Sequence, residues 1–280
     1  MTAQPLAPEV APPDGAAAAV LWPRVADIRP IGLAELDAGF ALQRRTDHKY
    51  FLPAALVAPF LDRVGDRLRV LDIDGLRAFG YASTYFDSPD LLTYRAHLQG
   101  RRRRFKVRVR TYTDSGTTAL EVKLKGSRGE TVKRRRPHAE HARGTLGHDG
   151  HTFVAGCVAD AYGLPVPREL APVLTTTNHR VTFAATGEDA RMTFDLGVTC
   201  RDAATTRGAV RLDAERILVE TKSGAGAGTL DLVLRGLGVR PVSVSKYCLG
   251  VAVLRPELAG NPWHRVLREQ FHPVPLEELT

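Results

Sequence analysis

The sequence contains few cysteines and lacks the short motifs of several large enzyme classes. Its 280 residues include three cysteines, Cys157, Cys200 and Cys248, which lie too far apart in the chain for a metal-ligand spacing. An odd number of thiols also argues against a disulfide framework and is typical of a reducing compartment, so we expect a cytoplasmic protein. There is no Gly-x-x-x-x-Gly-Lys-Ser/Thr phosphate loop and no Gly-x-Ser-x-Gly nucleophile turn, which excludes the enzymes that depend on them.

Long apolar runs are absent too. No stretch reaches the roughly 18 apolar residues of a membrane helix. No basic segment precedes the short run from Ala16 to Leu21, so no signal peptide is expected. Residues 1–25 are rich in Pro and Ala, which predicts a disordered tail. Residues 26–258 are predicted to form a single domain, followed by a C-terminal extension over residues 259–280.

The sequence instead combines an excess of positive charge with the periodicity of β-strands. Lysine and arginine number 39 against 31 aspartates and glutamates, a formal net charge of +8 that indicates an anionic partner. Alternation of apolar and polar residues predicts strands over 43–52, 78–86, 103–112, 117–125, 130–136, 173–184, 191–196, 209–212 and 216–222. One helix is predicted to start at residue 53, and a short helix is predicted to end at residue 98. Further helices are predicted within 138–164 and over 229–237 and 245–254. The predicted fold class is α+β.

The strand over 103–112 shows the charge pattern best. Successive side chains of a strand point to opposite sides, so one face of this strand carries only cations. They are Arg104, Lys106, Arg108 and Arg110. Neighbouring cations on that face are about 6.5–7 Å apart, and such a row is stable only in water or against a polyanion. Taken alone, the strand is equally well explained by a solvated outer face.

Further strands also pair an apolar face with a charged face, where cations are mixed with carboxylates. The charged positions are Arg45, Asp47, Lys49, Glu121, Lys123, Lys133, Arg135, Arg180, Arg191, Asp195, Glu220 and Lys222. We predict that the strands close into an antiparallel β-barrel, with helices packed outside and the charged faces lining the bore. Such a bore would be unstable when empty, which predicts triphosphate or a phosphate chain as its ligand. The acids Glu121, Asp195 and above all Glu220 would ligate Mg²⁺ or Mn²⁺, or would only neutralise neighbouring cations.

These strands resemble the VTC domain, the polyphosphate polymerase domain of the vacuolar transporter chaperone complex, within the triphosphate tunnel metalloenzyme superfamily. The matching pieces occur in family order. They are Arg45-Thr46-Asp47-His48-Lys49-Tyr50, Thr84-Tyr85-Phe86-Asp87 with Tyr94, Lys106-Val107-Arg108-Val109-Arg110, Leu120-Glu121-Val122-Lys123, Asn178-His179-Arg180-Val181-Thr182-Phe183, Arg191-Met192-Thr193-Phe194-Asp195, Val219-Glu220-Thr221-Lys222 and Val244-Ser245-Lys246-Tyr247. The hydrolytic and cyclase members of the superfamily carry Glu-x-Glu-x-Lys where this chain has Arg45 to Lys49, which favours the VTC branch.

The resemblance implies a tunnel barrel that transfers the γ-phosphate of ATP to a growing polyphosphate chain and releases ADP, with Mn²⁺ or Mg²⁺ as cofactor. It implies that Glu220 ligates the metal, and we predict that Glu220, Lys222 and Arg180 carry catalysis. The phosphate ligands that it implies are Lys49, Arg108, Arg110, Lys123, Arg180, Arg191 and Lys246, together with Lys133 or Arg134. No nucleic-acid partner is expected, and coupling synthesis to transport would need a separate membrane protein.

Two alternatives to polymerase activity stay open. A hydrolase of tripolyphosphate or of an organic triphosphate would use the same barrel, with water as the attacking group. A polyanion-binding module or polyphosphate sensor would keep the cations and lose the metal. Four histidines lie close together in sequence, but they have no cysteine partners, so we do not expect them to form a zinc site. These are His138, His141, His148 and His151.

Overall fold

The computed structural model describes residues 14–39, 46–126, 131–187, 190–203, 208–224, 226–258 and 263–275. A single sheet of 12 strands lies within these ranges. The strands are β1 (Pro30–Ile31), β2 (Thr46–Pro53), β3 (Leu68–Leu71), β4 (Phe79–Asp87), β5 (Phe105–Tyr112), β6 (Thr118–Lys125), β7 (Thr131–Pro137), β8 (Ala171–Ala185), β9 (Ala190–Asp202), β10 (Ala209–Leu212), β11 (Arg216–Ser223) and β12 (Phe271–Val274). All the pairings between them are antiparallel except that of β1 with β3.

The α-helices lie between these strands and around the sheet, which confirms the predicted α+β class. They are α1 (Ala16–Asp27), α2 (Leu33–Gly39), α3 (Ala54–Val64), α4 (Leu92–Leu98), α5 (Gly147–Tyr162), α6 (Thr229–Gly236), α7 (Lys246–Leu254) and α8 (His264–Gln270). Short 3₁₀ helices occupy Gly65–Arg67 and Glu140–Ala142. Nowhere in the described ranges does a helix combine the length and the apolar composition that a membrane span needs.

The sheet is strongly curled. In the hydrogen-bonded order, β9, β8, β4 and β5 separate β11 from β6, which in a flat sheet would place them about 24 Å apart. The charge of Lys123 on β6 nevertheless lowers the pKa of Glu220 on β11. An interaction between these two side chains indicates that the two ends of the sheet curl toward each other. We call the concave side that they share the inner face, and the opposite side the outer face.

The curled sheet does not close into a barrel. Among the described residues, β7 pairs only with β6 and β2 pairs only with β11, so both are edge strands. The prediction of a closed antiparallel barrel is therefore not confirmed. The physical reason lies in the run from Lys133 to Arg136, which places cations on both sides of β7 and leaves it exposed, without an apolar face to bury. Charged side chains on an edge strand oppose further pairing.

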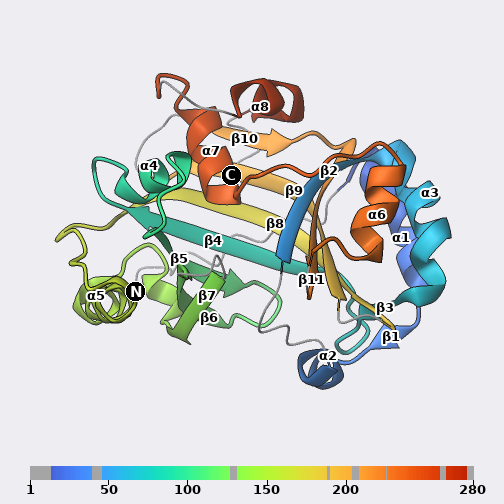
Figure 1. Cartoon of the computed structure of the whole chain (residues 1–280), viewed down its shortest axis with the longest axis horizontal. Helices are drawn as coiled ribbons and strands as arrows, with labels where there is room; N and C mark the ends of the chain where they lie inside the picture. Colours follow the sequence, from blue (N-terminus) through green and yellow to red (C-terminus); the bar gives the residue numbers. More distant parts are fainter. Residues whose placement is uncertain are drawn as a thin grey trace, which may run out of the picture.

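Helices cover the outer face in two groups (Figure 1). The first group, α1, α3 and α6, shares a buried cluster with β2, β8, β9 and β11, in which Phe60 of α3 lies against Phe194 of β9. The helix α5 covers the other end, where its Val154 and Val158 join Val122 of β6 in a second cluster. Because the apolar side chains of the strands turn outward toward these helices, the alternate, charged side chains are left on the inner face.

The helix α7 packs on the inner face itself. Gly197 has a φ of 58° and adds one residue to β9 at a bulge, so that Val198 and Cys200 follow Asp195 on the inner side. These two residues share a buried cluster with α7. At Gly250 an added Cβ would lie 2.5 Å from the side chain of Leu174, so glycine permits the close contact of helix and sheet. The packing brings the first residue of α7 to the charged part of the inner face.

The predicted disordered tail over residues 1–25 is wrong for residues 16–25, which belong to α1. Residues 1–13 lie outside the described residues. Alanine has the highest helix propensity, and Ala17, Leu21 and Val25 form a buried stripe that packs on the outer-face cluster. The segment from Ala16 to Ala19 is entirely alanine and shows little hydrophobic contrast, and for that reason composition alone predicted disorder.

Some helix and strand boundaries differ from those predicted from the sequence, and the structure contains a few short elements that were not predicted. The predicted helical segment over 138–164 is helical from Gly147 to Tyr162, after a short 3₁₀ turn. The strands β1 and β3 were not predicted, and neither were α8 and β12. Because β12 pairs with β10, residues 271–274 of the predicted C-terminal extension belong to the sheet. The start of the strand predicted from residue 43, with Arg45, lies outside the described residues.

Candidate functional site

Three lysines lie directly opposite one another on the inner face. Strand register places Lys106 of β5 beside Lys123 of β6, and Lys123 beside Lys133 of β7. Burial lowers the pKa of Lys106, and the charge of Arg108, followed by burial, lowers the pKa of Lys123 well below its ordinary value. Like charges directly opposite in a sheet destabilise it. This lysine row therefore favours an anion bound between its members.

The next row pairs an arginine with a buried carboxylate. Arg108 Nε and Nη2 donate to Glu121 Oε2 over 2.8 and 2.5 Å. Lys133 Nζ lies 3.4 Å from Glu121 Oε1, and Arg108 Nη1 lies 3.3 Å from the hydroxyl of Tyr85. Burial alone would raise the pKa of Glu121, but the surrounding cations, Arg108 first, hold it below its ordinary value. Glu121 is thus ionised, and both of its carboxylate oxygens are paired with Arg108 or Lys133.

A second buried carboxylate, Asp195 of β9, organises the opposite part of the inner face. Arg180 of β8 donates from Nε to Asp195 Oδ1 over 2.7 Å and from Nη2 to Oδ2 over 2.8 Å. Lys246 Nζ lies 2.9 Å from Asp195 Oδ2 and donates to Asn178 Oδ1 over 2.5 Å. Burial alone would raise the pKa of Asp195, but Arg180 and Lys246 hold it below its ordinary value. The side chain of Asp195 therefore positions one arginine and one lysine.

Lys246 also stands at the positive end of a helix. It is the first residue of α7, whose N-cap Ser245 accepts a hydrogen bond from Cys248 N over 3.2 Å. Burial lowers the pKa of Lys246 to about 8, although the charge of Asp195 partly offsets this effect. The partial positive charge of a helix N-terminus attracts anions, so both the side chain and the helix favour negative charge at this position.

Glu220 of β11 is held less closely than the other two carboxylates. Lys49 of β2 lies opposite it, with Nζ 3.8 Å from Glu220 Oε1, and 17% of the Glu220 side chain is exposed. Burial alone would raise the pKa of Glu220, but nearby cations hold it well below its ordinary value. These cations are Lys222, Lys49, Lys123 and Arg180. Glu220 is therefore an ionised carboxylate that no arginine fork occupies.

Aromatic rings position two of the arginines. The guanidinium carbons of Arg110 and Arg180 lie 4.9 and 5.1 Å from the ring centroid of Tyr81. Arg110 Nε also donates to Ser83 Oγ over 3.2 Å. For Arg110, the cation–π contact and this hydrogen bond hold the guanidinium group in place without neutralising it, and its charge remains available to an anion, whereas Arg180 is also paired with Asp195.

Most of the predicted site residues come together on the inner face. These are Lys49, Arg108, Arg110, Lys123, Lys133, Arg180, Glu220, Lys222 and Lys246. Two do not. Arg134 lies opposite Val122 of the outer-face cluster; burial raises the pKa of Cys157 on α5, and the nearby charge of Arg134 partly offsets this. Of Lys133 and Arg134, the register therefore selects Lys133. Arg191 is directed away to α2, where it donates to Leu36 O and lies 3.2 Å from Asp37 Oδ1.

Several residues of the site were not assigned to it from the sequence. Tyr81 and Tyr85 were not predicted as site residues, although their alternation with Ser83 along β4 places all three on the inner face. Asn178 carries no charge and was noted only as part of the matching piece from Asn178 to Phe183. Lys106 was recognised on the cationic face of its strand but was not among the implied phosphate ligands.

The acidic residues fit a divalent cation only in part. Glu121 and Asp195 are occupied by arginines, and among the described residues no group of three His, Cys, Asp or Glu side chains could hold a metal ion. Glu220 can supply one hard oxygen ligand, which suits Mg²⁺ or Mn²⁺. The nearby cations oppose a bare metal ion. The residues therefore fit a cation that binds together with phosphate oxygens, and do not fit a metal bound by the protein alone.

Replacing Lys123 by Met should stabilise the empty protein and weaken tripolyphosphate binding by about 10- to 100-fold. The change removes the central cation of the lysine row, which forms no ion pair among the described residues. Thermal unfolding of the empty protein and calorimetry with tripolyphosphate would measure the two effects. Arg102→Met, at an exposed loop position, should change neither. A lower unfolding temperature for Lys123→Met would show that Lys123 stabilises the fold.

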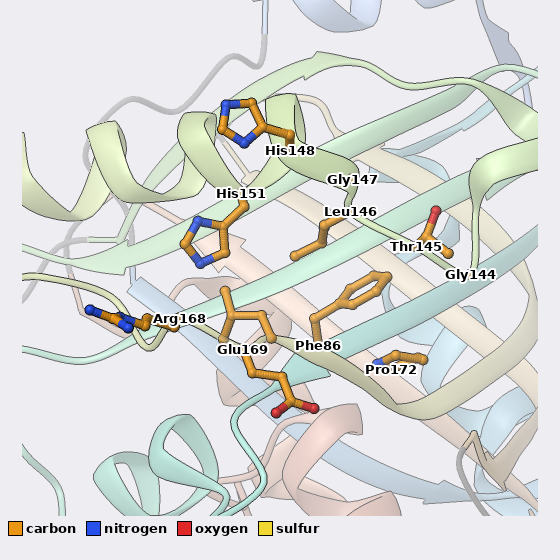
Figure 2. A pocket seen from close by; sticks show the side chains of 11 residues that line it. Phe86, Gly144, Thr145, Leu146, Gly147, His148, His151, Arg168, Glu169 and Pro172 are labelled. Carbon is orange, nitrogen blue, oxygen red and sulfur yellow. The ribbon is translucent and has the colours of Figure 1, made fainter.

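His148 and His151, two of the four histidines that lie close in sequence, belong to α5 on the outer face. His148 and His151 line a hollow of about 490 Å³ on the α5 side of the sheet. Figure 2 shows both on α5, with Arg168 and Glu169 across from them. His138 Nε2 lies 3.1 Å from two backbone carbonyl oxygens, and His151 Nε2 lies 2.8 Å from Pro167 O. Backbone contacts thus account for two of these four histidines.

Comparison with known proteins connects this chain to one family. A profile of the VTC domain matches residues 44–255. A candidate adenylate cyclase from Bacillus halodurans superposes with a TM-score of 0.46 at 9% identity, over 72% of this chain and 94% of the other. A candidate adenylyl cyclase from Hippeastrum, described with a dominant triphosphatase activity, gives 0.44 at 13% identity, over 74% and 94%. Nothing about activity follows from TM-scores below 0.5. No curated protein sequence matches.

Proposed function

Because the chain belongs to the VTC domain family, we propose that it transfers the γ-phosphoryl group of ATP to a growing polyphosphate chain on the inner face of its curled sheet. The observation that carries this proposal is the surplus of cations there. Lys106 and Lys123 stand directly opposite each other, and Arg110 and Lys49 add charge that Glu121 and Asp195, already paired, do not balance. A linear polyanion supplies the missing negative charge.

In the proposed reaction, a terminal oxygen of the polyphosphate chain forms a bond to the γ-phosphorus of ATP. The bond from that phosphorus to the β–γ bridging oxygen breaks, and ADP leaves with the electron pair. Phosphoryl transfer depends on positioning and charge stabilisation more than on covalent catalysis. Arg108 and Lys123 would hold phosphates from one side of the inner face. Arg180 and Lys246, both positioned by Asp195, would hold them from the other.

Glu220 and Lys222 would act at the transferred group. Glu220 would hold Mg²⁺ or Mn²⁺ jointly with phosphate oxygens, and Lys222, two residues along the same strand face, would contact the same phosphates. When bound, the metal supplies Lewis-acid neutralisation of charge on the phosphate oxygens. A separate membrane protein that receives the product, and a cytoplasmic location, remain predictions from the sequence.

Incubation of the purified protein with ATP and Mn²⁺, following free phosphate and acid-precipitable polyphosphate, tests the proposal. Polyphosphate formed together with ADP would support it. Free phosphate without polymer would show a hydrolase, in which water replaces the phosphate chain as the attacking group. Tripolyphosphate binding without turnover would show a sensor.

The affinity for tripolyphosphate should fall as the pH rises above about 8, because burial lowers the pKa of Lys246 to about 8. Below that pH the lysine is charged, and above it the charge is lost, so the affinity should fall by up to about tenfold per pH unit. Calorimetric titrations between about pH 6.5 and 9.5 measure this slope. In Lys246→Arg the charge persists, so the slope should become shallower by the part that Lys246 contributes, while Lys106 and Lys123 still titrate. A wild-type affinity that does not change with pH would contradict the assignment.

A further inference from the structure

A buried hydroxyl without a partner lies beside Glu220. Thr193 of β9 is 3% exposed, and its Oγ1 has no hydrogen-bond partner. Buried polar atoms are nearly always paired in native proteins, so an exception needs an explanation. An unpaired hydroxyl at this depth destabilises the empty protein. A ligand that binds next to it would remove that penalty.

Strand register places this hydroxyl on the inner face. Thr193 lies directly opposite Glu220 of β11 on one side and Thr182 of β8 on the other. Its neighbours in sequence, Met192 and Phe194, are buried in the outer-face cluster, so the side chain of Thr193 must point inward. Residues directly opposite in an antiparallel pair have Cβ atoms about 4.5–5.5 Å apart. The hydroxyl and the Glu220 carboxylate are thus neighbours on one surface.

We propose that Thr193 Oγ1 is the second protein ligand of the divalent cation that Glu220 holds together with phosphate oxygens. The proposal rests on the proposed function, because it concerns the same cation. Glu220 provides only one carboxylate. Several lysines and Arg180 already surround it, so this part of the inner face has enough positive charge but too few oxygen ligands for a metal ion. A neutral hydroxyl adds an oxygen without adding charge, which suits a cation already surrounded by phosphates.

The chemistry has a general precedent. Phosphate-binding loops hold Mg²⁺ with a Ser or Thr hydroxyl, one carboxylate and the phosphates of the nucleotide. The pair of Thr193 and Glu220 presents the same types of oxygen from two adjacent strands. A rigid sheet would hold the two oxygens at a fixed separation, which a loop does not.

Thr193→Val tests the proposal because valine keeps the shape of the side chain and removes only the oxygen. Mn²⁺ binding is followed by electron paramagnetic resonance in the presence of an ATP analogue with a β–γ imido bridge. Binding of the same analogue without metal, and the thermal midpoint of the empty protein, are measured in parallel. Thr193→Ser retains the hydroxyl. Thr111→Val is the matched control, because it removes a buried threonine hydroxyl that is paired with Thr118 Oγ1 at 2.9 Å.

We expect Mn²⁺ affinity to fall roughly tenfold in Thr193→Val and to remain near wild type in Thr193→Ser. The thermal midpoint of empty Thr193→Val should rise by about 2–4 °C, since an unpaired hydroxyl is removed. Thr111→Val should instead lose stability and keep its Mn²⁺ affinity. Analogue binding without metal should be unchanged in Thr193→Val.

Two results would overturn the proposal while leaving the proposed function intact. In the first, Thr193→Val binds Mn²⁺ like wild type although Glu220→Gln does not. In the second, Thr193→Val weakens analogue binding equally with and without metal, which would make the hydroxyl a phosphate ligand. If the wild-type protein itself binds no Mn²⁺ with the analogue present, both the proposal and the metal-dependent function fail.

Discussion

Replacing Glu220 by Gln is expected to reduce metal-dependent turnover of ATP by at least about 10²-fold, while tripolyphosphate still binds. Glu220 is an inner-face carboxylate that no arginine fork occupies, and Lys49 Nζ lies 3.8 Å from its Oε1. Glutamine keeps the size of the side chain but loses the charge that a divalent cation needs. Phosphate binding depends on the cations, which the change leaves in place.

Turnover is measured with ATP and Mn²⁺, and binding is measured by calorimetry with tripolyphosphate. Glu215→Gln is the matched control, because Glu215 is an exposed residue just before the same strand and should behave like wild type. Unfolding of Glu220→Gln would show that the carboxylate only neutralises neighbouring cations. Full activity would exclude Glu220 as a metal ligand.

Replacing Arg108 by Ala is expected to destabilise the protein by about 3–5 kcal/mol, because it leaves the buried carboxylate of Glu121 without its main partner. A loss of that size is a large part of the total stability of a typical domain, about 5–15 kcal/mol. The variant should also lose most of its affinity for tripolyphosphate. Arg102→Ala, in the exposed loop before the same strand, should affect neither property.

A double substitution separates the two roles of Arg108. In Arg108→Met with Glu121→Gln, both charges of the pair are removed and the fold should recover much of its stability. If Arg108 binds phosphate, the recovered protein should still bind tripolyphosphate about 10- to 100-fold more weakly than wild type. Chemical denaturation and calorimetry measure the two quantities. Wild-type affinity in the stable double variant would limit Arg108 to a structural role.

The sequence predicted the faces of the strands better than their global arrangement. A period of two places Arg108 and Arg110 on the same side as Glu121 whatever the curvature of the sheet, and the structure agrees. The choice between Lys133 and Arg134 required the pairing register of β7, which depends on a turn that the local pattern does not determine. Arg191 shows a further limit, since α2 draws its side chain away from the site.

Long-range packing accounts for the rest of what the sequence did not predict. Closure of the barrel depends on whether β7 finds a partner across the sheet, and the cations on both sides of β7 were a local signal against closure that the barrel prediction did not use. The place of α7 on the inner face depends on a bulge at Gly197 and on the close contact at Gly250. Asn178 became recognisable as a site residue only when Lys246, 68 residues later, was found to donate to its amide oxygen.

Filling the lysine row with phosphate would draw protons from solution. In the empty protein, burial and neighbouring cations lower the pKa of Lys106 and of Lys123. An anion between them reverses the effect and raises both pKa values, so binding takes up protons and release returns them. The catalytic cycle would then include an exchange of protons with the buffer, and the observed heat of binding would vary with the ionisation enthalpy of that buffer.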